Sequence, residues 1–150
     1  MNNKYCFYGF EAAKNITTDN SEFPSIKTPV DLYEALSGIW CAETCAPRMR
    51  AEWSKNNITK GQCSITAFLV QDIFDGEVYG TYSKAGDLHL YNVVNGIIFD
   101  LTSEQFGEEA ADLIYNKSNP QNRESEIHFG KEEKRKRYEY LKNELKKLQR

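Results

Sequence analysis

Three residues whose side chains act together in nucleophilic catalysis occur in order along this sequence: Cys63, His89 and Asp100. A thiol beside an imidazole can give its proton to the ring and attack a carbonyl carbon. A carboxylate on the far side of the ring holds the ring in the tautomer that accepts this proton. The chemistry therefore depends on whether the elements that carry the three residues bring them together.

Cys63 stands at the start of a segment that has almost no polar face. A helix that is apolar on most of its circumference is a central, buried helix, and Cys63 would lie in its first turn. The free backbone N–H groups and the positive end of the helix dipole favour a thiolate there. The plainer interpretation is a cysteine that serves as a small buried hydrophobic side chain. The apolar residues at helical spacing are Ile65, Phe68, Leu69, Ile73 and Phe74, with Ala67 and Val70 between them.

The residues after this helix predict an antiparallel sheet. Alternating β-forming residues favour strands over 77–82, 88–94 and 97–102. Asn95-Gly96, between the last two strands, is the strongest short hairpin signal and predicts a two-residue type I′ loop. The expected fold class is α+β, with a central buried helix packed on an antiparallel sheet.

The hairpin loop sets the register of its two strands. Val94 pairs with Ile97, and the same register carried along the strands puts Tyr91 opposite Asp100. Because side chains alternate between the two faces, His89 and Asp100 become diagonal neighbours on one face. Asp100 follows an apolar run, where an unpaired carboxylate is costly and an imidazole is a natural partner. Taken singly, His89 could be an ordinary core histidine and Asp100 a strand-end cap.

Length and composition indicate one globular domain of ordinary make-up. The chain has 150 residues, of which 40% are hydrophobic and 27% charged, and its net charge is -3. This balance gives no reason to expect nucleic acid as a partner. The N-terminus lacks a basic stretch followed by an apolar run, and no segment is apolar enough to span a membrane. We therefore expect a cytoplasmic protein without disulfides.

The four cysteines include one pair with partial metal-site spacing. Cys41 and Cys45 resemble half of a zinc site, but no second pair of close Cys or His residues follows them. His89 and His128 are also far apart in the sequence. We therefore expect neither a metal nor another cofactor.

The single predicted domain has three regions. Residues 1–27 are interpreted as an N-terminal extension that either wraps the domain or is partly disordered. Residues 28–106 form the core, which opens with a helix that Thr28 caps and Pro29 begins. Residues 131–150 hold nine Lys or Arg and four Glu and predict a basic amphipathic helix, either solvated or docked on the body or on an anionic surface. Its apolar stripe comprises Tyr138, Leu141, Leu145 and Leu148.

Several short motifs recur in a fixed order through the core of the sequence. They are Trp53, Gly61-Gln62-Cys63, Thr66-Ala67, Asp72, His89-Leu90-Tyr91-Asn92, Asp100-Leu101-Thr102 and Gln105-Phe106. Together they resemble the YunG-like family of uncharacterised bacterial proteins. The resemblance covers residues 36–106 and does not extend beyond them. Departures from the family pattern at Leu90-Tyr91 and at Phe74-Asp75-Gly76 leave His89 and Asn92 in place.

This resemblance implies a papain-like or transglutaminase-like fold, with the cysteine on a helix and the histidine and aspartate on successive strands. Such folds host proteolysis, amide hydrolysis, deamidation and acyl transfer, and the fold alone does not choose among them. We predict a cysteine-dependent amide hydrolase or acyl transferase that acts on a peptide or protein amide. Cys63 would attack the carbonyl, His89 would act as base and then acid, and Asp100 would orient the ring. The Cys63 backbone N–H would bind the oxyanion, with the Gln62 or Asn92 side-chain amide as second donor.

Two other functions fit the same residues. A non-catalytic module could keep the cleft in order to bind a peptide or a protein partner, with the C-terminal helix as the contact or as a homodimer interface. Alternatively, Cys63, His89 and Asp100 could bind zinc, which accepts all three ligand types.

Overall fold

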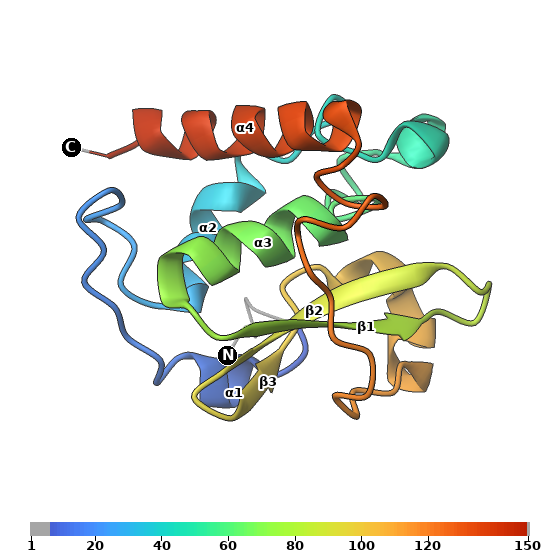
Figure 1. Ribbon diagram of the computed structural model, residues 1–150, viewed down its shortest axis with the longest axis horizontal. Coiled ribbons are helices and arrows are strands. Elements are labelled where there is room, and N and C mark those ends of the chain that lie inside the picture. The colour runs from blue at the N-terminus through green and yellow to red at the C-terminus, as the bar shows by residue number, and fades with distance from the viewer. Residues whose placement is uncertain (1–6, 150) are drawn as a thin grey trace.

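One buried helix, α3 (Cys63–Phe74), crosses the centre of the molecule in the computed structural model, which describes residues 7–149 (Figure 1). Its side chains are buried on nearly every side, from Ile65 to Val70 and again at Ile73 and Phe74. The sequence-based prediction of a central helix that begins at Cys63 is therefore confirmed. Because it is surrounded by other elements, this helix holds its first turn in a fixed place relative to the sheet.

Three antiparallel strands form the sheet beneath α3, in the order β1-β2-β3. The strands are β1 (Glu77–Tyr82), β2 (Leu88–Val94) and β3 (Ile97–Phe99). Asn95 and Gly96 have φ values of 53° and 78°, as a type I′ loop requires. Val94 pairs with Ile97, so the predicted hairpin register is confirmed.

The third strand is shorter than the sequence predicts. Its pairing with β2 ends at Asn92–Phe99, so the expected pairing of Tyr91 with Asp100 does not form. Instead Asp100 makes an isolated bridge with Tyr8, whose carbonyl oxygen accepts from the Asp100 N–H at 3.0 Å. A segment distant in sequence thus takes the backbone group that would have continued the strand.

The N-terminal segment contributes to the core rather than lying apart from it. Residues 7–27 include the short helix α1 (Phe10–Ala13), which contacts β3. Residues 1–6 of the predicted extension lie outside the described residues, and Phe7 is buried. The other buried side chains of this segment are Ala13, Ile16, Phe23 and Ile26.

Helix α2 (Pro29–Ser37) begins as its sequence predicts. The Thr28 side chain accepts from the Asp31 N–H at 3.1 Å, and the Asp31 carboxylate accepts from the Thr28 N–H at 3.1 Å. This reciprocal capping box satisfies two donors that would otherwise be unpaired. Leu32 and Leu36 are fully buried against the core. The 3₁₀ segments η1 (Pro47–Glu52) and η2 (Ser103–Asp112), the second of which is kinked at Gly107, complete the connections around the sheet and α3.

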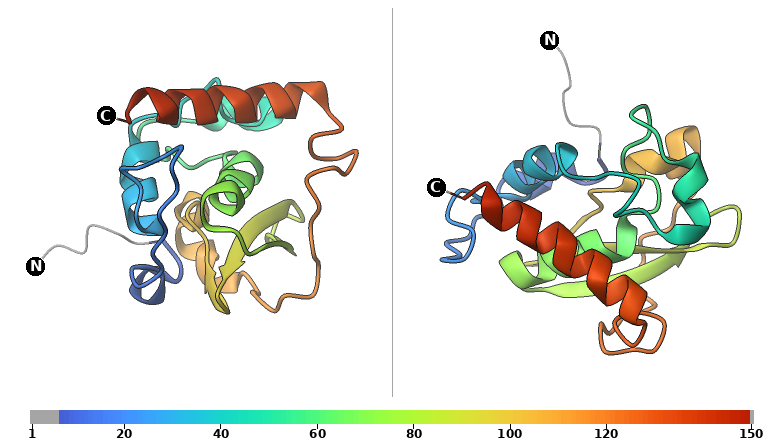
Figure 2. Two further views of the ribbon diagram at one scale, coloured as in Figure 1. Left: turned by 60° about the vertical axis from the view of Figure 1, so that its left-hand side comes forward. Right: turned by 90° about the horizontal axis from the view of Figure 1, so that it is seen from above.

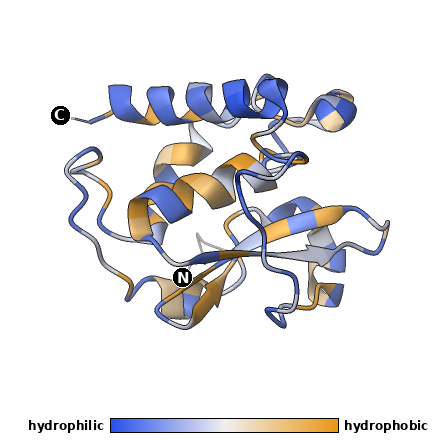
Figure 3. Cartoon of the chain, viewed as in Figure 1, coloured by the Kyte–Doolittle hydropathy of each residue, from blue (hydrophilic) through white to orange (hydrophobic). Residues whose placement is uncertain are grey.

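The C-terminal helix α4 (Glu132–Lys147) lies on the side of α3 opposite the sheet (Figures 1 and 2). Its hydrophilic face points away from the body, whereas α3 is largely hydrophobic (Figure 3). Tyr138, Leu141 and Leu145 of the predicted stripe are buried, and Leu148 is 51% exposed. Lys146 also pairs with Glu22 at 2.8 Å. A homodimer through α4 stays a prediction, and it would have to use the polar face of the helix.

No helix within residues 7–149 combines the length and the apolar character needed to cross a membrane.

Replacing Leu141 with alanine should lower the free energy of unfolding by about 2–5 kcal/mol, because it leaves a cavity between α4 and the core. Urea unfolding followed by circular dichroism measures this loss. The matched control is Leu148→Ala, at the exposed end of the same helix, which should change the stability by less than about 0.5 kcal/mol. Equal stability of the two variants would contradict the packing of α4 on the body.

Candidate active site

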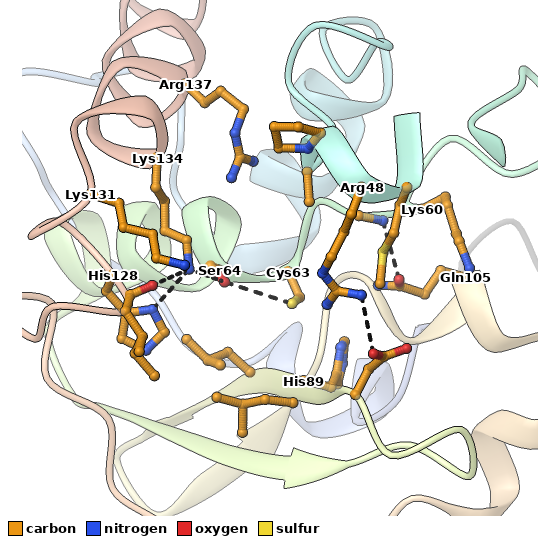
Figure 4. Close-up of a pocket in the computed structure, with 18 of the residues that line it drawn as sticks. Arg48, Lys60, Cys63, Ser64, His89, Gln105, His128, Lys131, Lys134 and Arg137 are labelled. Atoms are coloured by element: carbon orange, nitrogen blue, oxygen red, sulfur yellow. Dashed lines mark hydrogen bonds and ion pairs between the residues drawn. The ribbon is translucent and has the colours of Figure 1, made fainter. Parts of the chain in front are cut away.

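A cavity of about 480 Å³ opens beside the first turn of α3 (Figure 4). Its walls come from α3, β2, η1, η2, α4 and the segment that leads into α4. Cys63 and His89 both line it, Cys63 from the helix and His89 from the strand. The sulfur of Cys63 lies near the His89 ring in the middle of the cavity (Figure 4).

The turn before Cys63 explains how the cysteine reaches this position. Gly61 has a φ of 70°, and a Cβ there would lie 2.5 Å from the Cys45 sulfur. Only glycine fits such a close approach without a shift of the surroundings. The Gly61 N–H donates to the Gln105 side-chain oxygen at 3.2 Å. The backbone at Gly61 is thus fixed between Cys45 and Gln105 just before α3 begins.

His89 is buried on β2 and bonded to Asp100 as the hairpin register predicts. The distance from His89 Nε2 to Asp100 Oδ2 is 2.6 Å, and both side chains are 1% exposed. The ring of Phe106 packs edge-on against the imidazole with 4.8 Å between the ring centroids. The imidazole therefore has one fixed plane and one committed nitrogen.

Asp100 is surrounded by donors in addition to His89. Its Oδ1 accepts from the Thr102 N–H at 3.2 Å and the Thr102 hydroxyl at 3.3 Å. The Tyr115 hydroxyl donates to Oδ2 at 2.7 Å. Burial raises the pKa of Tyr115, and the charge of Asp100 raises it further, so the phenol stays a donor. Sequence reasoning missed Tyr115, and the polar stretch around it gives no signal for this role.

The second ring nitrogen of His89 is available to the thiol. Nδ1 is buried and has no fixed hydrogen-bond partner among residues 7–149. Burial lowers the pKa of His89, but the charge and hydrogen bond of Asp100, together with the interactions of Cys63, outweigh this effect and raise the pKa to about 10. The ring is therefore suited to hold a proton next to the sulfur.

Burial raises the pKa of the Cys63 thiol, but interactions with its neighbours outweigh this effect and bring the pKa to about 7. The charged His89 ring contributes most, followed by the backbone N–H of Leu90. The Ser64 hydroxyl is 3.9 Å from the sulfur. Leu90 N–H is a further group that the sequence did not single out, because any residue could supply it. The combined effect favours a thiolate–imidazolium pair.

The two side chains proposed as oxyanion donors lie elsewhere. Gln62 is fully buried, and its amide donates to the Cys41 carbonyl at 3.1 Å. The Asn92 amide donates to the Ala67 carbonyl at 2.9 Å, which ties β2 to α3. Neither side chain lines the cavity. We correct both assignments, because each amide donates to a backbone carbonyl of the scaffold and lies outside the cavity that Cys63 lines.

The geometry does not fit a zinc site built from the same three residues. The imidazole stands between the other two groups, with Nε2 committed to Asp100 and Nδ1 on the side of Cys63. Zinc would need all three donor atoms within about 2.0–2.3 Å of one point. Within residues 7–149, no group of three His, Cys, Asp or Glu side chains is arranged to hold a metal ion.

The remaining described cysteines are free thiols. Cys41 is half-buried and Cys45 is fully buried. Burial raises the pKa of the Cys45 thiol. Cys6 lies outside the described residues.

A comparison with protein families extends the similarity beyond the motifs of the core. A family model described as YunG protein matches residues 28–149. The chain belongs to the YunG family. The YunG match runs to the end of α4, so the sequence-based limits of 36–106 were too narrow. The chemistry-bearing motifs lie within those limits, whereas α4 is an amphipathic helix without a distinctive motif.

One curated relative is the uncharacterized protein YunG of Bacillus subtilis (strain 168). The two sequences are 36% identical over 66 residues, which cover 39% of this chain and 56% of the relative. The alignment therefore spans little more than half of that protein. No solved structure gave a significant match, so the papain-like or transglutaminase-like assignment stays a prediction.

The rate of Cys63 alkylation by iodoacetamide should rise with pH through a midpoint near 7, because the thiolate is the reacting form. Asp100→Asn removes the charge that keeps the ring protonated, so the midpoint should move up toward the ordinary thiol value of about 8.5. Mass spectrometry after timed quenching measures each cysteine separately. Cys45 serves as the internal control, and a Cys63 that reacts more slowly than Cys45 would contradict the proposed ion pair.

Proposed function

We propose that this YunG-family protein is a cysteine-dependent acyl-transfer enzyme that hydrolyses or transfers an amide. The observation that carries the proposal is the buried 2.6 Å contact between His89 and Asp100, on a ring whose other nitrogen is available to a cavity-lining thiol. Catalytic cysteines need a lowered thiol pKa and an adjacent proton carrier. Cys63 and His89 meet both requirements.

In the acylation step, the Cys63 thiolate forms a bond to the carbonyl carbon, and the π electron pair moves to the oxygen. When the tetrahedral intermediate collapses, the C–N bond breaks and the His89 Nδ1–H gives its proton to the leaving amine. Asp100 keeps Nε2 protonated throughout, so Nδ1 is the nitrogen that exchanges protons. The product is a thioester on Cys63 beside a neutral imidazole.

In the deacylation step, His89 Nδ1 takes a proton from water or from an acceptor amine, which attacks the thioester carbonyl. The new C–O or C–N bond forms, the C–S bond breaks, and the thiolate–imidazolium pair is restored. The cavity holds no feature that selects water over an amine. Hydrolysis and transfer therefore remain two outcomes of one mechanism.

The developing oxyanion would be bound by backbone donors. The Cys63 N–H belongs to the first turn of α3, where N–H groups have no partner within the helix. The Leu90 N–H, which already interacts with the sulfur, is the second donor that we assign in place of the Gln62 and Asn92 amides. Donors of this kind are aimed before the reaction begins and need no reorganisation.

The order of the elements supports a papain-like or transglutaminase-like relationship. Cys63 begins a central helix, His89 lies on the following hairpin, and Asp100 follows the second hairpin strand. In this proposal the fold positions the three reacting side chains, and the substrate is a peptide or protein amide.

A panel of acyl-type activity probes tests the proposal directly. Wild-type protein should be labelled at Cys63, Cys63→Ala should lose all labelling there, and His89→Ala should react about 10²–10⁴-fold more slowly, because the general base is gone. Intact-mass measurement gives the rates, and Cys41→Ala is the matched control with unchanged labelling.

Equal labelling of wild type and His89→Ala would contradict the catalytic role of the ring. Absence of labelling in a folded wild-type protein would favour the non-catalytic binding module instead.

A further inference from the structure

The cavity beside Cys63 is lined by more cations than its own carboxylates neutralise. Five Lys or Arg side chains line it, against Asp87 and Glu133. Three of the five have a carboxylate within ion-pair distance, whereas Lys131 and Lys134 have none among residues 7–149. The three pairs are Arg48–Asp87, Lys60–Glu52 and Arg137–Glu133.

Lys134 is held inside this cavity by neutral acceptors. Its ammonium donates to the Ile127 carbonyl at 2.8 Å, to His128 Nδ1 at 3.1 Å and to the Ser64 hydroxyl oxygen at 3.4 Å. Figure 4 shows the side chain reaching from α4 toward Ser64 and Cys63 rather than into solvent. A lysine whose three ammonium protons all point at fixed acceptors holds its charge at one position, whereas the side chain of a surface lysine is mobile.

His128 is the part of this arrangement that fixes the direction of Lys134. It is 1% exposed, and its Nε2–H donates to the Gln121 side-chain oxygen at 2.8 Å. Burial lowers the pKa of His128 to about 4, with a smaller effect from the Lys134 charge, so the ring is neutral and Nδ1 accepts. Burial likewise lowers the pKa of Lys134 to about 8, while the nearby Cys63 thiolate favours its charged form.

The proposed reaction changes the charge that Lys134 faces. Before acylation, the Cys63 thiolate lies close enough to stabilise the ammonium. Acylation replaces the thiolate–imidazolium pair with a neutral thioester and a neutral imidazole, so Lys134 loses the anion that stabilises it and stays a half-buried cation without an ion-pair partner in the described part of the chain. An anionic group on the acyl portion of the substrate would restore the balance at this stage.

We propose that the cavity selects acyl donors that carry a carboxylate close to the scissile carbonyl, and that Lys134 and Ser64 bind this carboxylate. The proposal rests on the proposed function for its acyl chemistry, and it adds the class of substrate. The longest of the three Lys134 contacts is the one to Ser64, at 3.4 Å. A carboxylate oxygen would replace that contact and also accept from the Ser64 hydroxyl.

The position of Ser64 sets how near the carboxylate must be. Its hydroxyl is 3.9 Å from the Cys63 sulfur and 3.4 Å from Lys134 Nζ. The carboxylate would therefore lie only a few bonds from the carbon that the sulfur attacks. Acyl groups derived from short dicarboxylic acids or from acidic side chains meet this requirement.

Iodoacetate and iodoacetamide provide a matched pair of probes, because they differ only in a carboxylate against a carboxamide beside the reacting carbon. The rate of Cys63 alkylation by iodoacetate, divided by the rate with iodoacetamide, should fall about tenfold in Lys134→Met. The reason is that the carboxylate of iodoacetate loses a partly desolvated contact with the Lys134 charge. A general loss of thiolate would slow both reagents and leave the ratio unchanged. Lys136→Met is the matched control on the same helix, because Lys136 is exposed and paired with Glu132, and its ratio should equal that of wild type.

A second measurement uses only the wild-type protein and does not depend on the folding of a variant. Glutarate should protect Cys63 from iodoacetamide at lower concentration than the neutral diamide of the same acid. Equal protection by the two compounds, or an unchanged rate ratio in a folded Lys134→Met, would overturn the carboxylate site.

Turnover of two activated esters separates this inference from the function on which it rests. The wild-type protein should hydrolyse the p-nitrophenyl monoester of glutarate, which carries a free carboxylate, faster than the p-nitrophenyl ester of glutaric acid monoamide, which is neutral. Lys134→Met should remove this preference. Turnover of both esters without a preference would overturn the inference alone. If the protein hydrolyses neither ester, but the preference of Cys63 for iodoacetate still depends on Lys134, the proposed function is overturned and the carboxylate site is supported.

Discussion

The hydrogen bond between His89 and Asp100 is the constraint on which the rest of the site depends. It lies in the protein interior, where both groups are 1% exposed and an unpaired carboxylate would be costly. Because Nε2 of the ring is committed to Asp100, only Nδ1 can exchange a proton with Cys63. The ring charge that results is what offsets the burial of the thiol and brings its pKa to about 7.

This contact is maintained by elements that are distant in sequence. The hairpin places His89 and Asp100 on one face, α3 brings Cys63 to the cavity that His89 lines, and the Tyr115 hydroxyl donates to the Asp100 carboxylate. The bridge of Tyr8 to Asp100 ends the third strand at the required point. Helix α4 packs on the side of α3 that faces away from the sheet, and its Lys134 contributes positive charge to the wall of the cavity. The N-terminal segment and the C-terminal helix therefore shape the site although neither carries Cys63, His89 or Asp100.

The predictable part of this arrangement comes from local signals. The apolar periodicity from Ile65 to Phe74 predicts the helix, and Asn95-Gly96 predicts a register that places His89 and Asp100 on the same face. The oxyanion assignments failed because residue type does not show which carbonyl an amide will satisfy, and Asn92 serves the scaffold. Tyr115 and Lys134 could not be found from local patterns, since each reaches the site through contacts between segments far apart in the chain.

The protonation state of His89 distinguishes a thiolate–imidazolium pair from a neutral thiol beside a neutral ring. Nitrogen-15 NMR of the imidazole at about pH 8, between the pKa values of the two partners, reports whether one or both ring nitrogens carry a proton. We expect a doubly protonated ring in the wild-type protein, and a lower imidazole pKa once Cys63 is blocked by a neutral alkyl group, because the thiolate that stabilises the ring proton is then gone. A ring that is already neutral at about pH 8 in the unmodified protein would rule out the thiolate–imidazolium pair.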